Sequence, residues 1–220
     1  MPGEHRLWIP ASFALLLATG CVTPHGAVNP ELVAAAERQD ALATSDTLEA
    51  LIERGADSPA DREYAYQSIV GEKVDGAAYS FARAAVTGRL VQQRGLRGAQ
   101  QVGEVERWAR RSRKLDPDFR DGAATRLLGT LYVIAPATFL EHGDSEQGLE
   151  LLEQLVKQHP DVPENQLRLA EAFIALGDPD PAEPHLCASL VQRASLRRDD
   201  QQLLDQLVAT AGTPDCTNPN

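Results

Sequence analysis

The residues best suited to chemistry are four cations on one predicted helix over residues 100–114. Arg107, Arg110, Arg111 and Lys114 are spaced by three and four positions, so they share one helix face. Guanidinium groups bind carboxylates bidentately, and this face could therefore dock an acidic partner or hold a carboxylate ligand. The alternative is a solvated face whose charges pair with nearby acids, and the sequence alone favours that alternative.

No catalytic or metal-binding pattern accompanies these cations. The chain contains no G-x-S-x-G, H-E-x-x-H, G-x-x-x-x-G-K or G-x-G-x-x-G sequence. His185 and Cys187 could ligate a metal, but two ligands do not make a site. We therefore predict a protein that is not an enzyme and has neither a cofactor nor a metal site.

Composition narrows the class of protein further. At 220 residues and 43% hydrophobic, the chain can bury a core, and its 5% aromatic content with abundant Ala and Leu favours helix over sheet. The net charge of −11 argues against nucleic-acid binding, because phosphates attract basic surfaces. Residues 87–126 depart from this balance, since they hold ten Arg and Lys against five acids.

The first twenty residues are predicted to be a targeting segment. Arg6 precedes an apolar run over residues 7–17 that is too short to remain as a membrane-spanning helix. The run ends in the sequence LATGC, which resembles the lipobox of bacterial lipoproteins, where a peptidase cuts before a lipidated cysteine. The resemblance implies a lipid on Cys21 and a periplasmic body, and Val22 favours the outer membrane. The alternative is an ordinary cleaved signal peptide with an incidental cysteine.

Two cysteines remain if Cys21 carries lipid. Cys187 and Cys216 lie 29 residues apart, flank the last predicted helix and would reside in an oxidising compartment. We predict a disulfide between them, worth about 3–4 kcal/mol by loop-closure entropy. Two free thiols are the alternative.

The body of the chain is predicted to be all-α. After a tether over residues 21–29, apolar residues recur at helical spacing through a domain over residues 30–212, and residues 213–220 form a C-terminal tail. Glycine and proline punctuation separates the helices, which are predicted at 30–42, 45–54, 59–70, 77–94, 100–114, 121–141, 145–158, 163–176, 181–195 and 198–210.

An internal repeat organises these helices. Two Gly-Asp pairs, at 143 and 177, are 34 residues apart, which is the period of the tetratricopeptide repeat. In the later copy the repeat positions are held by Leu169, Ala170, Phe173, Ala182 and Leu186. In the earlier copy the alignment assigns Ala135, Pro136, Phe139, Gly148, Leu152 and Leu155 to the repeat. This predicts antiparallel helical hairpins stacked as a tetratricopeptide-like superhelix.

Residues 121–186 resemble the T component of tetratricopeptide-associated TRAP transporters. The resemblance rests on Leu128-Gly129 with Leu131-Tyr132, Ala135-Pro136, Gly143-Asp144, Pro160-Asp161 and the run Pro163-Glu164-Asn165 ahead of Leu169-Ala170-Glu171. It covers about a third of the chain closely and the remainder only in helical layout. It implies a lipid-anchored trimer that hands a small apolar or organic-acid ligand between a periplasmic solute-binding protein and the TRAP permease.

Pro136 is unusual because it lies inside the predicted helix 121–141. An internal proline removes a backbone hydrogen bond and clashes with the preceding turn. One interpretation is a kinked helix in which Tyr132, Pro136 and Phe139 line a ligand or partner surface, opposite the helix that starts near Asn165. The other interpretation is that the helix ends there and a loop begins.

The sequence supports two alternative functions. The first is the accessory ligand-handling or docking component of a TRAP-type transporter, which predicts an enclosed apolar pocket or a trimer pore. The second is a tetratricopeptide scaffold lipoprotein for outer-membrane or pilus assembly, which predicts an open groove lined by polar side chains.

Overall fold

The computed structural model describes residues 26–72 and 74–217, and this part of the chain contains α-helices, short 3-10 helices and no strand. The predicted leader over residues 1–20 and Cys21 lie outside the described residues. No helix in the described ranges is both long enough and apolar enough to cross a membrane. The α-helices are Pro30–Ala36 (α1), Ala41–Glu53 (α2), Pro59–Val70 (α3), Ala77–Arg94 (α4), Val102–Leu115 (α5), Ala123–Ile134 (α6), Ser145–Gln158 (α7), Pro163–Ala175 (α8), Glu183–Val191 (α9) and Arg198–Ala211 (α10).

Local sequence explains where several helices begin. At α3 the Ser58 hydroxyl accepts a hydrogen bond from the Asp61 amide, and the Asp61 carboxylate accepts one from the Ser58 amide at 2.8 Å. This capping box satisfies amides that the helix itself leaves free. Asp144 caps α7 through the Gln147 amide at 2.9 Å, and Pro163 begins α8 where its missing N–H costs nothing.

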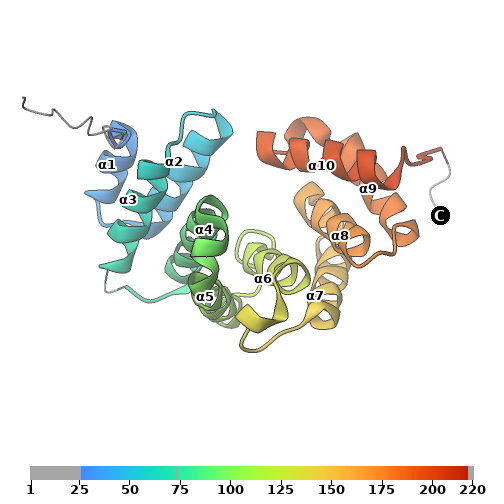
Figure 1. Ribbon diagram of the computed structural model, residues 1–220, viewed down its shortest axis with the longest axis horizontal. Helices are drawn as coiled ribbons and strands as arrows, with labels where there is room; N and C mark the ends of the chain where they lie inside the picture. The colour runs from blue at the N-terminus through green and yellow to red at the C-terminus, as the bar shows by residue number, and fades with distance from the viewer. Residues whose placement is uncertain (1–25, 73, 218–220) are drawn as a thin grey trace, which may run out of the picture.

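The helices form an arc of stacked hairpins, which confirms the predicted all-α, tetratricopeptide-like fold (Figure 1). The hairpins are α2–α3, α4–α5, α6–α7 and α8–α9, and α10 completes the series. The first helix of each hairpin and α10 face the inside of the arc, while the second helices lie on its outer side (Figure 1). Because neighbouring hairpins cover each other, the core continues from one end to the other as a series of buried clusters.

The α6–α7 hairpin has its closest approach at two glycines. A Cβ atom on Gly148 would lie 2.7 Å from the Gly129 carbonyl oxygen and 2.8 Å from the Tyr132 Cβ. A Cβ on Gly129 would lie 2.7 Å from the Leu152 Cγ. Both positions therefore require glycine, which confirms Gly148 as the small residue of the second helix.

The predicted alignment of the earlier repeat is wrong for its first helix. Leu128, Gly129 and Tyr132 occupy the positions that the repeat spacing assigns to Ala135, Pro136 and Phe139. The second helices keep the predicted 34-residue period between Gly148 and Ala182. The stretch from Gly129 to Gly148 is seven residues longer than the stretch from Ala170 to Ala182, and this insertion lies in the hairpin turn.

The kinked-helix interpretation of Pro136 is also wrong, and the loop interpretation is correct. Helix α6 ends at Ile134, and Ala135 is extended with ψ 141°. A proline disfavours helical geometry in the residue before it, which explains why the helix stops there. A single 3-10 turn over Ala137–Phe139 follows, and the chain then runs to α7.

Two further predicted helices are interrupted. The helix predicted over 30–42 ends at Ala36, because Gln39 adopts a left-handed φ of 54° before α2 begins. The helix predicted over 181–195 is α9 flanked by two 3-10 turns, Asp180–Ala182 and Arg193–Ser195. Neither interruption changes the order of the hairpins.

The predicted disulfide is present. Cys187 on α9 is bonded to Cys216 in the C-terminal tail, with their Cα atoms 5.4 Å apart. The Asp215 amide also donates to the Glu183 carboxylate at 2.8 Å. The tail is therefore held against α9 by a covalent and a polar contact.

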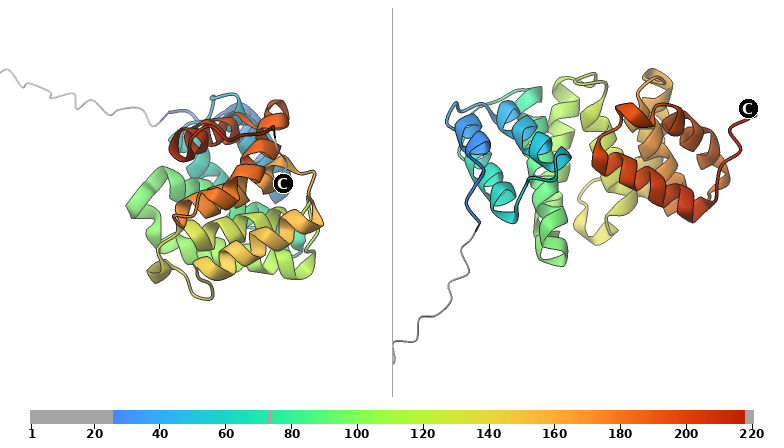
Figure 2. Two further views of the ribbon diagram at one scale, coloured as in Figure 1. Left: turned by 90° about the vertical axis from the view of Figure 1, so that its right-hand side faces the viewer. Right: turned by 90° about the horizontal axis from the view of Figure 1, so that it is seen from above.

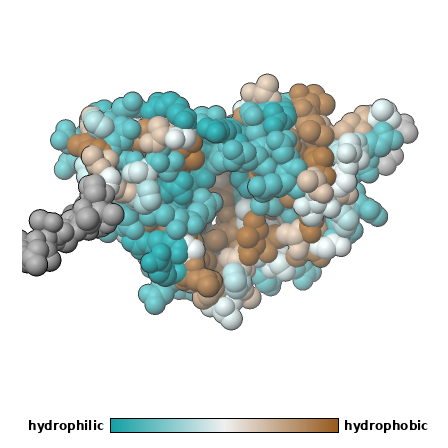
Figure 3. All heavy atoms as spheres, turned by 45° about the horizontal axis from the view of Figure 1, so that its top comes forward, coloured by the Kyte–Doolittle hydropathy of each residue, from teal (hydrophilic) through white to brown (hydrophobic). Residues whose placement is uncertain are grey.

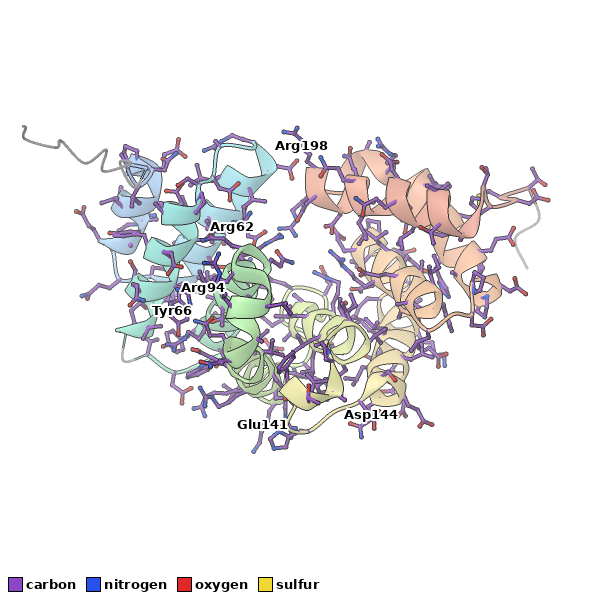
Figure 4. The ribbon with its side chains drawn as sticks, viewed as in Figure 1. Arg62, Tyr66, Arg94, Glu141, Asp144 and Arg198 are labelled. Carbon is purple, nitrogen blue, oxygen red and sulfur yellow. A yellow bond between two sulfur atoms is a disulfide. The ribbon has the colours of Figure 1, made fainter. Side chains whose placement is uncertain are left out.

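The two ends of the arc meet through charged side chains. The Arg198 amide of α10 donates to Glu53 of α2 at 2.8 Å, and Arg197 pairs with Glu49. Arg89 of α4 bridges Glu49 at 2.6 Å and Asp199 at 2.8 Å. Arg198 lies between the ends of α2 and α10 in Figure 4, and the approach of these helices is visible in Figure 2. We call the residues that make this junction the clasp, namely Glu49, Glu53, Arg89, Arg197, Arg198 and Asp199.

The glycine crossing carries a testable consequence for stability. We expect Gly148→Ala to lower the free energy of unfolding by about 1–3 kcal/mol, because the added methyl group meets the Gly129 carbonyl oxygen and the Tyr132 Cβ, which cannot move aside without shifting α6. Gly88→Ala is the matched control, because that helical glycine has no atom within 4 Å of the place its methyl group would take, and it should stabilise by about 0.5–1 kcal/mol. Urea denaturation of both variants measures the difference, and equal midpoints would contradict the close crossing.

Candidate functional site

The inner side of the arc encloses a groove with a volume of about 690 Å³. It is lined by α2, α4, α6, α8 and α10, the helices that face inward in Figure 1. Figure 3 shows the molecule hollowed at its centre, with hydrophobic side chains inside the hollow and a largely hydrophilic rim. The apolar strip comes from α4 and α6 and includes Phe81, Ala85, Leu127 and Ile134. We call this hollow the concave groove.

Charged side chains dominate the rest of the concave groove, and four of its arginines are neutralised within the chain. Arg120 pairs with Asp46 at 2.7 Å, and Arg168 pairs with Asp200 at 2.6 Å. Arg89 and Arg197 belong to the clasp and share Glu49. These four cations are thus committed to holding the hairpins together.

Arg126 is the exception among the groove arginines. It makes no ion pair with any carboxylate in the described parts of the chain. Its Nη1 donates to the neutral side-chain oxygen of Asn165 at 2.6 Å. Burial lowers the pKa of Arg126, and the nearby charge of Glu164 offsets only part of that effect. A crowded guanidinium without a carboxylate is unfavourable unless a ligand supplies one.

Asn165 holds this guanidinium in place. It is fully buried at the start of α8, and its side-chain amide donates to the Asp121 carbonyl at 3.4 Å. That bond leaves the side-chain oxygen directed at Arg126. The predicted ligand residue Asn165 is thus a positioning residue for Arg126.

The predicted cations of α5 lie on the opposite side of the molecule. Arg107, Arg110 and Arg111 line a cleft of about 930 Å³ between α5 and α7, whose floor is formed by Leu128 and Tyr132 of α6. We call it the convex cleft. The basic segment 87–126 is thus divided between two surfaces, because Arg89 and Arg126 belong to the concave groove.

The structure does not bring Tyr132, Pro136 and Phe139 together as one ligand surface. Pro136 and Phe139 are exposed on the α6–α7 loop, whereas Tyr132 is 3% exposed beneath it. The Tyr132 hydroxyl donates to Glu106 at 2.9 Å. Burial and this carboxylate raise the pKa of Tyr132 to about 12, so the phenol stays protonated and serves as a structural donor.

Sequence reasoning missed Arg126 and Arg168. A usable signal was present, since each is a lone cation within the apolar pattern of an inner helix, in LRLAEAF for Arg168 and ATRLLG for Arg126. The described residues contain no group of three potential metal ligands. Cys187 is bonded to Cys216 and so is not a free partner for His185.

Comparison with known proteins supports one class. Residues 139–209 match the family model described as tetratricopeptide repeat. This match covers about a third of the chain and agrees with the stacked helical hairpins of the structure. Tetratricopeptide repeats in general stack into concave surfaces that bind other proteins. No curated protein matches the chain.

Proposed function

We propose that this protein is a non-catalytic scaffold that binds an acidic segment of a partner protein in its concave groove. The observation that carries the proposal is Arg126, the groove arginine that no carboxylate of the described chain neutralises. A carboxylate on the partner would supply the missing charge by a bidentate contact. The neighbouring strip with Phe81 and Leu127 would take an apolar side chain of the same segment.

The proposal places the scaffold at a membrane in the periplasm. Its support is the sequence LATGC ending at Cys21, which would carry the lipid and leave the helical body in the periplasm, with the outer membrane favoured. Assembly of outer-membrane or pilus components would give such a scaffold its partners. The polar and charged lining of the concave groove favours this function over an enclosed apolar pocket.

A second candidate is the accessory component of a TRAP-type transporter, with a solute-binding protein and the permease as partners. Two properties of the concave groove favour it. Its volume of about 690 Å³ lies within the range of about 300–1,000 Å³ that is usual for small-ligand sites. Arg126 would bind the carboxylate of an organic acid as readily as that of a protein segment. In this case the ligand is a small molecule, and the concave groove of each protein molecule binds one ligand molecule.

Photo-crosslinking inside cells tests the scaffold proposal. A photo-reactive amino acid in place of Gln92, on the rim of the concave groove, should capture a partner protein. The same amino acid in place of Leu96, which is 91% exposed outside the groove, should not. Mass spectrometry of the captured species identifies outer-membrane or pilus components under the scaffold proposal, and a solute-binding protein with a TRAP permease under the second candidate.

Arg126→Gln is the decisive variant in that experiment. We expect capture from position 92 to fall at least about tenfold, because a charge-assisted hydrogen bond is lost. Arg38→Gln, on an exposed position away from the groove, should leave capture unchanged. Glu164→Gln should strengthen capture, because Glu164 competes for the charge of Arg126. Capture that Arg126→Gln does not reduce would overturn the proposal.

A further inference from the structure

The convex cleft is a second surface that the proposed function does not use. Helices α5 and α7 belong to consecutive hairpins and both pack on α6, so a cleft of about 930 Å³ remains between them. Its floor is deep, because Leu128 and Tyr132 line it while being only 2% and 3% exposed. The cleft therefore has walls and a floor, unlike an ordinary solvated helix face.

Charge in the convex cleft is strongly one-sided. Its lining contains five cations of α5, namely Arg107, Arg110, Arg111, Arg113 and Lys114. The facing wall contributes a single carboxylate, that of Glu150. This excess stands out in a chain whose net charge is −11. A concave surface lined by one sign of charge concentrates counter-ions of the opposite sign.

The acids of the chain leave most of this charge free. Arg111 is neutralised by Asp75 at 2.5 Å, and the Arg110 guanidinium lies 3.8 Å from Glu106. Arg107, Arg113 and Lys114 make no ion pair with any residue in the described ranges. The sequence favours a solvated helix face whose cations pair with nearby acids. Arg111 does so, but Arg107, Arg113 and Lys114 do not within the described part of the chain.

Glu106 itself has little capacity left to neutralise the cleft. Its carboxylate accepts hydrogen bonds from the Tyr132 hydroxyl at 2.9 Å and from the backbone amides of Glu141 and His142 at 2.7 and 2.9 Å. Figure 4 shows Glu141 on the loop that runs along the outer side of the arc. The carboxylate thus fixes the wall of the cleft, while the cations above it remain available.

We propose that the convex cleft binds a phosphate-bearing ligand that carries two or more negative charges. Positions 107 to 114 span only about 10 Å of helix, so their cations match charges that are packed closely, as on adjacent phosphate groups. Charges on an extended polypeptide are spread more widely, because successive residues are about 3.3 Å apart and alternate in direction. Leu151, which is partly exposed, adds an apolar surface beside the phosphates for the remainder of the ligand.

Such phosphates have two possible sources, a soluble phosphorylated molecule or the headgroups of a membrane. The test uses the full chain with Cys21→Ser, so that no lipid on the protein can insert into vesicles. One arm titrates pyrophosphate by calorimetry. The other measures co-sedimentation with vesicles of phosphatidylglycerol, with phosphatidylcholine vesicles as the uncharged reference. The triple variant Arg107→Gln, Arg110→Gln, Lys114→Gln is measured in both arms, and Arg111→Gln is the matched control on the same wall.

We expect binding in at least one arm, and a loss of about tenfold or more in the triple variant, since each removed cation takes a charge-assisted contact with it. Arg111→Gln should weaken binding less than about twofold, because Asp75 already neutralises that side chain. Pyrophosphate binding identifies a soluble ligand, and binding to anionic vesicles alone identifies headgroups. Absence of binding in both arms, or equal binding by the triple variant, would overturn the proposal.

Discussion

Replacing Glu106 with alanine should lower the free energy of unfolding by about 3–5 kcal/mol. The Glu106 carboxylate is 1% exposed and accepts hydrogen bonds from Tyr132 and from two amides of the α6–α7 loop. Removing it leaves three donors unsatisfied, and each buried unsatisfied group costs about 1–3 kcal/mol. Urea denaturation followed by circular dichroism measures the change. The loop over residues 135–144 should also become sensitive to limited proteolysis.

A graded series separates this effect from simple loss of charge. Tyr132→Phe removes one donor and leaves the carboxylate with its two amides, so we expect a smaller loss of about 1–2 kcal/mol. Glu141→Ala removes an exposed carboxylate from the same loop and should change stability by less than about 0.5 kcal/mol. If Glu106→Ala were no more harmful than Glu141→Ala, the buried network would not be what holds the loop.

Much of the architecture could be predicted because stacked hairpins require apolar and small residues at regular intervals in the sequence. Apolar spacing located the inner helices, and small residues marked the crossings at Gly148 and Ala182. The misaligned first helix of the earlier repeat has a specific cause. The longer turn before Gly148 shifted the alignment, since a period measured on the second helices does not constrain the length of the turn that precedes them.

The candidate site was harder to predict because it depends on which charges are neutralised. Helical spacing placed Arg107 and Arg110 on one face, and they do share the convex cleft. Whether an arginine is free depends on acids far away in the chain. Arg89 is paired with Glu49, forty residues earlier, and Arg197 with the same residue, 148 residues earlier. The spacing of residues in the sequence does not predict ion pairs over such separations. Arg126 could therefore be recognised as unpaired only from the three-dimensional structure.

Glu49→Ala should open the clasp and widen the concave groove. Glu49 joins Arg89 of α4 to Arg197 next to α10, and its removal leaves two arginines facing each other without the carboxylate between them. We expect α10 to move away from α2 while each hairpin keeps its own core. Small-angle scattering should then give a radius of gyration about 1 Å above the value of the unmodified chain, for which about 17 Å is typical at this length.

The clasp should also open in acid, and the pKa of Glu49 sets the pH at which it opens. Burial raises the pKa of Glu49, but the hydrogen bonds and charges of Arg89 and Arg197 outweigh this and hold the pKa below its ordinary value of 4.5. A carboxylate with a lowered pKa stabilises the folded form above its unfolded pKa, and this contribution is lost as the pH falls through the folded value. The unmodified chain should therefore stay closed at pH 5 and expand only well below pH 4.5.

Two variants decide whether the clasp causes this behaviour. Glu49→Ala should already be expanded at pH 7 and should show a weaker change on acidification, because the titrating group is absent. Glu31→Ala removes an exposed carboxylate that pairs with Arg54 at 2.8 Å outside the groove, and it should behave like the unmodified chain. If Glu49→Ala kept the compact radius at pH 7, the hydrophobic contacts of the inner helices, and not the clasp, would close the arc. Access to Arg126 would then not depend on the junction of α2 with α10.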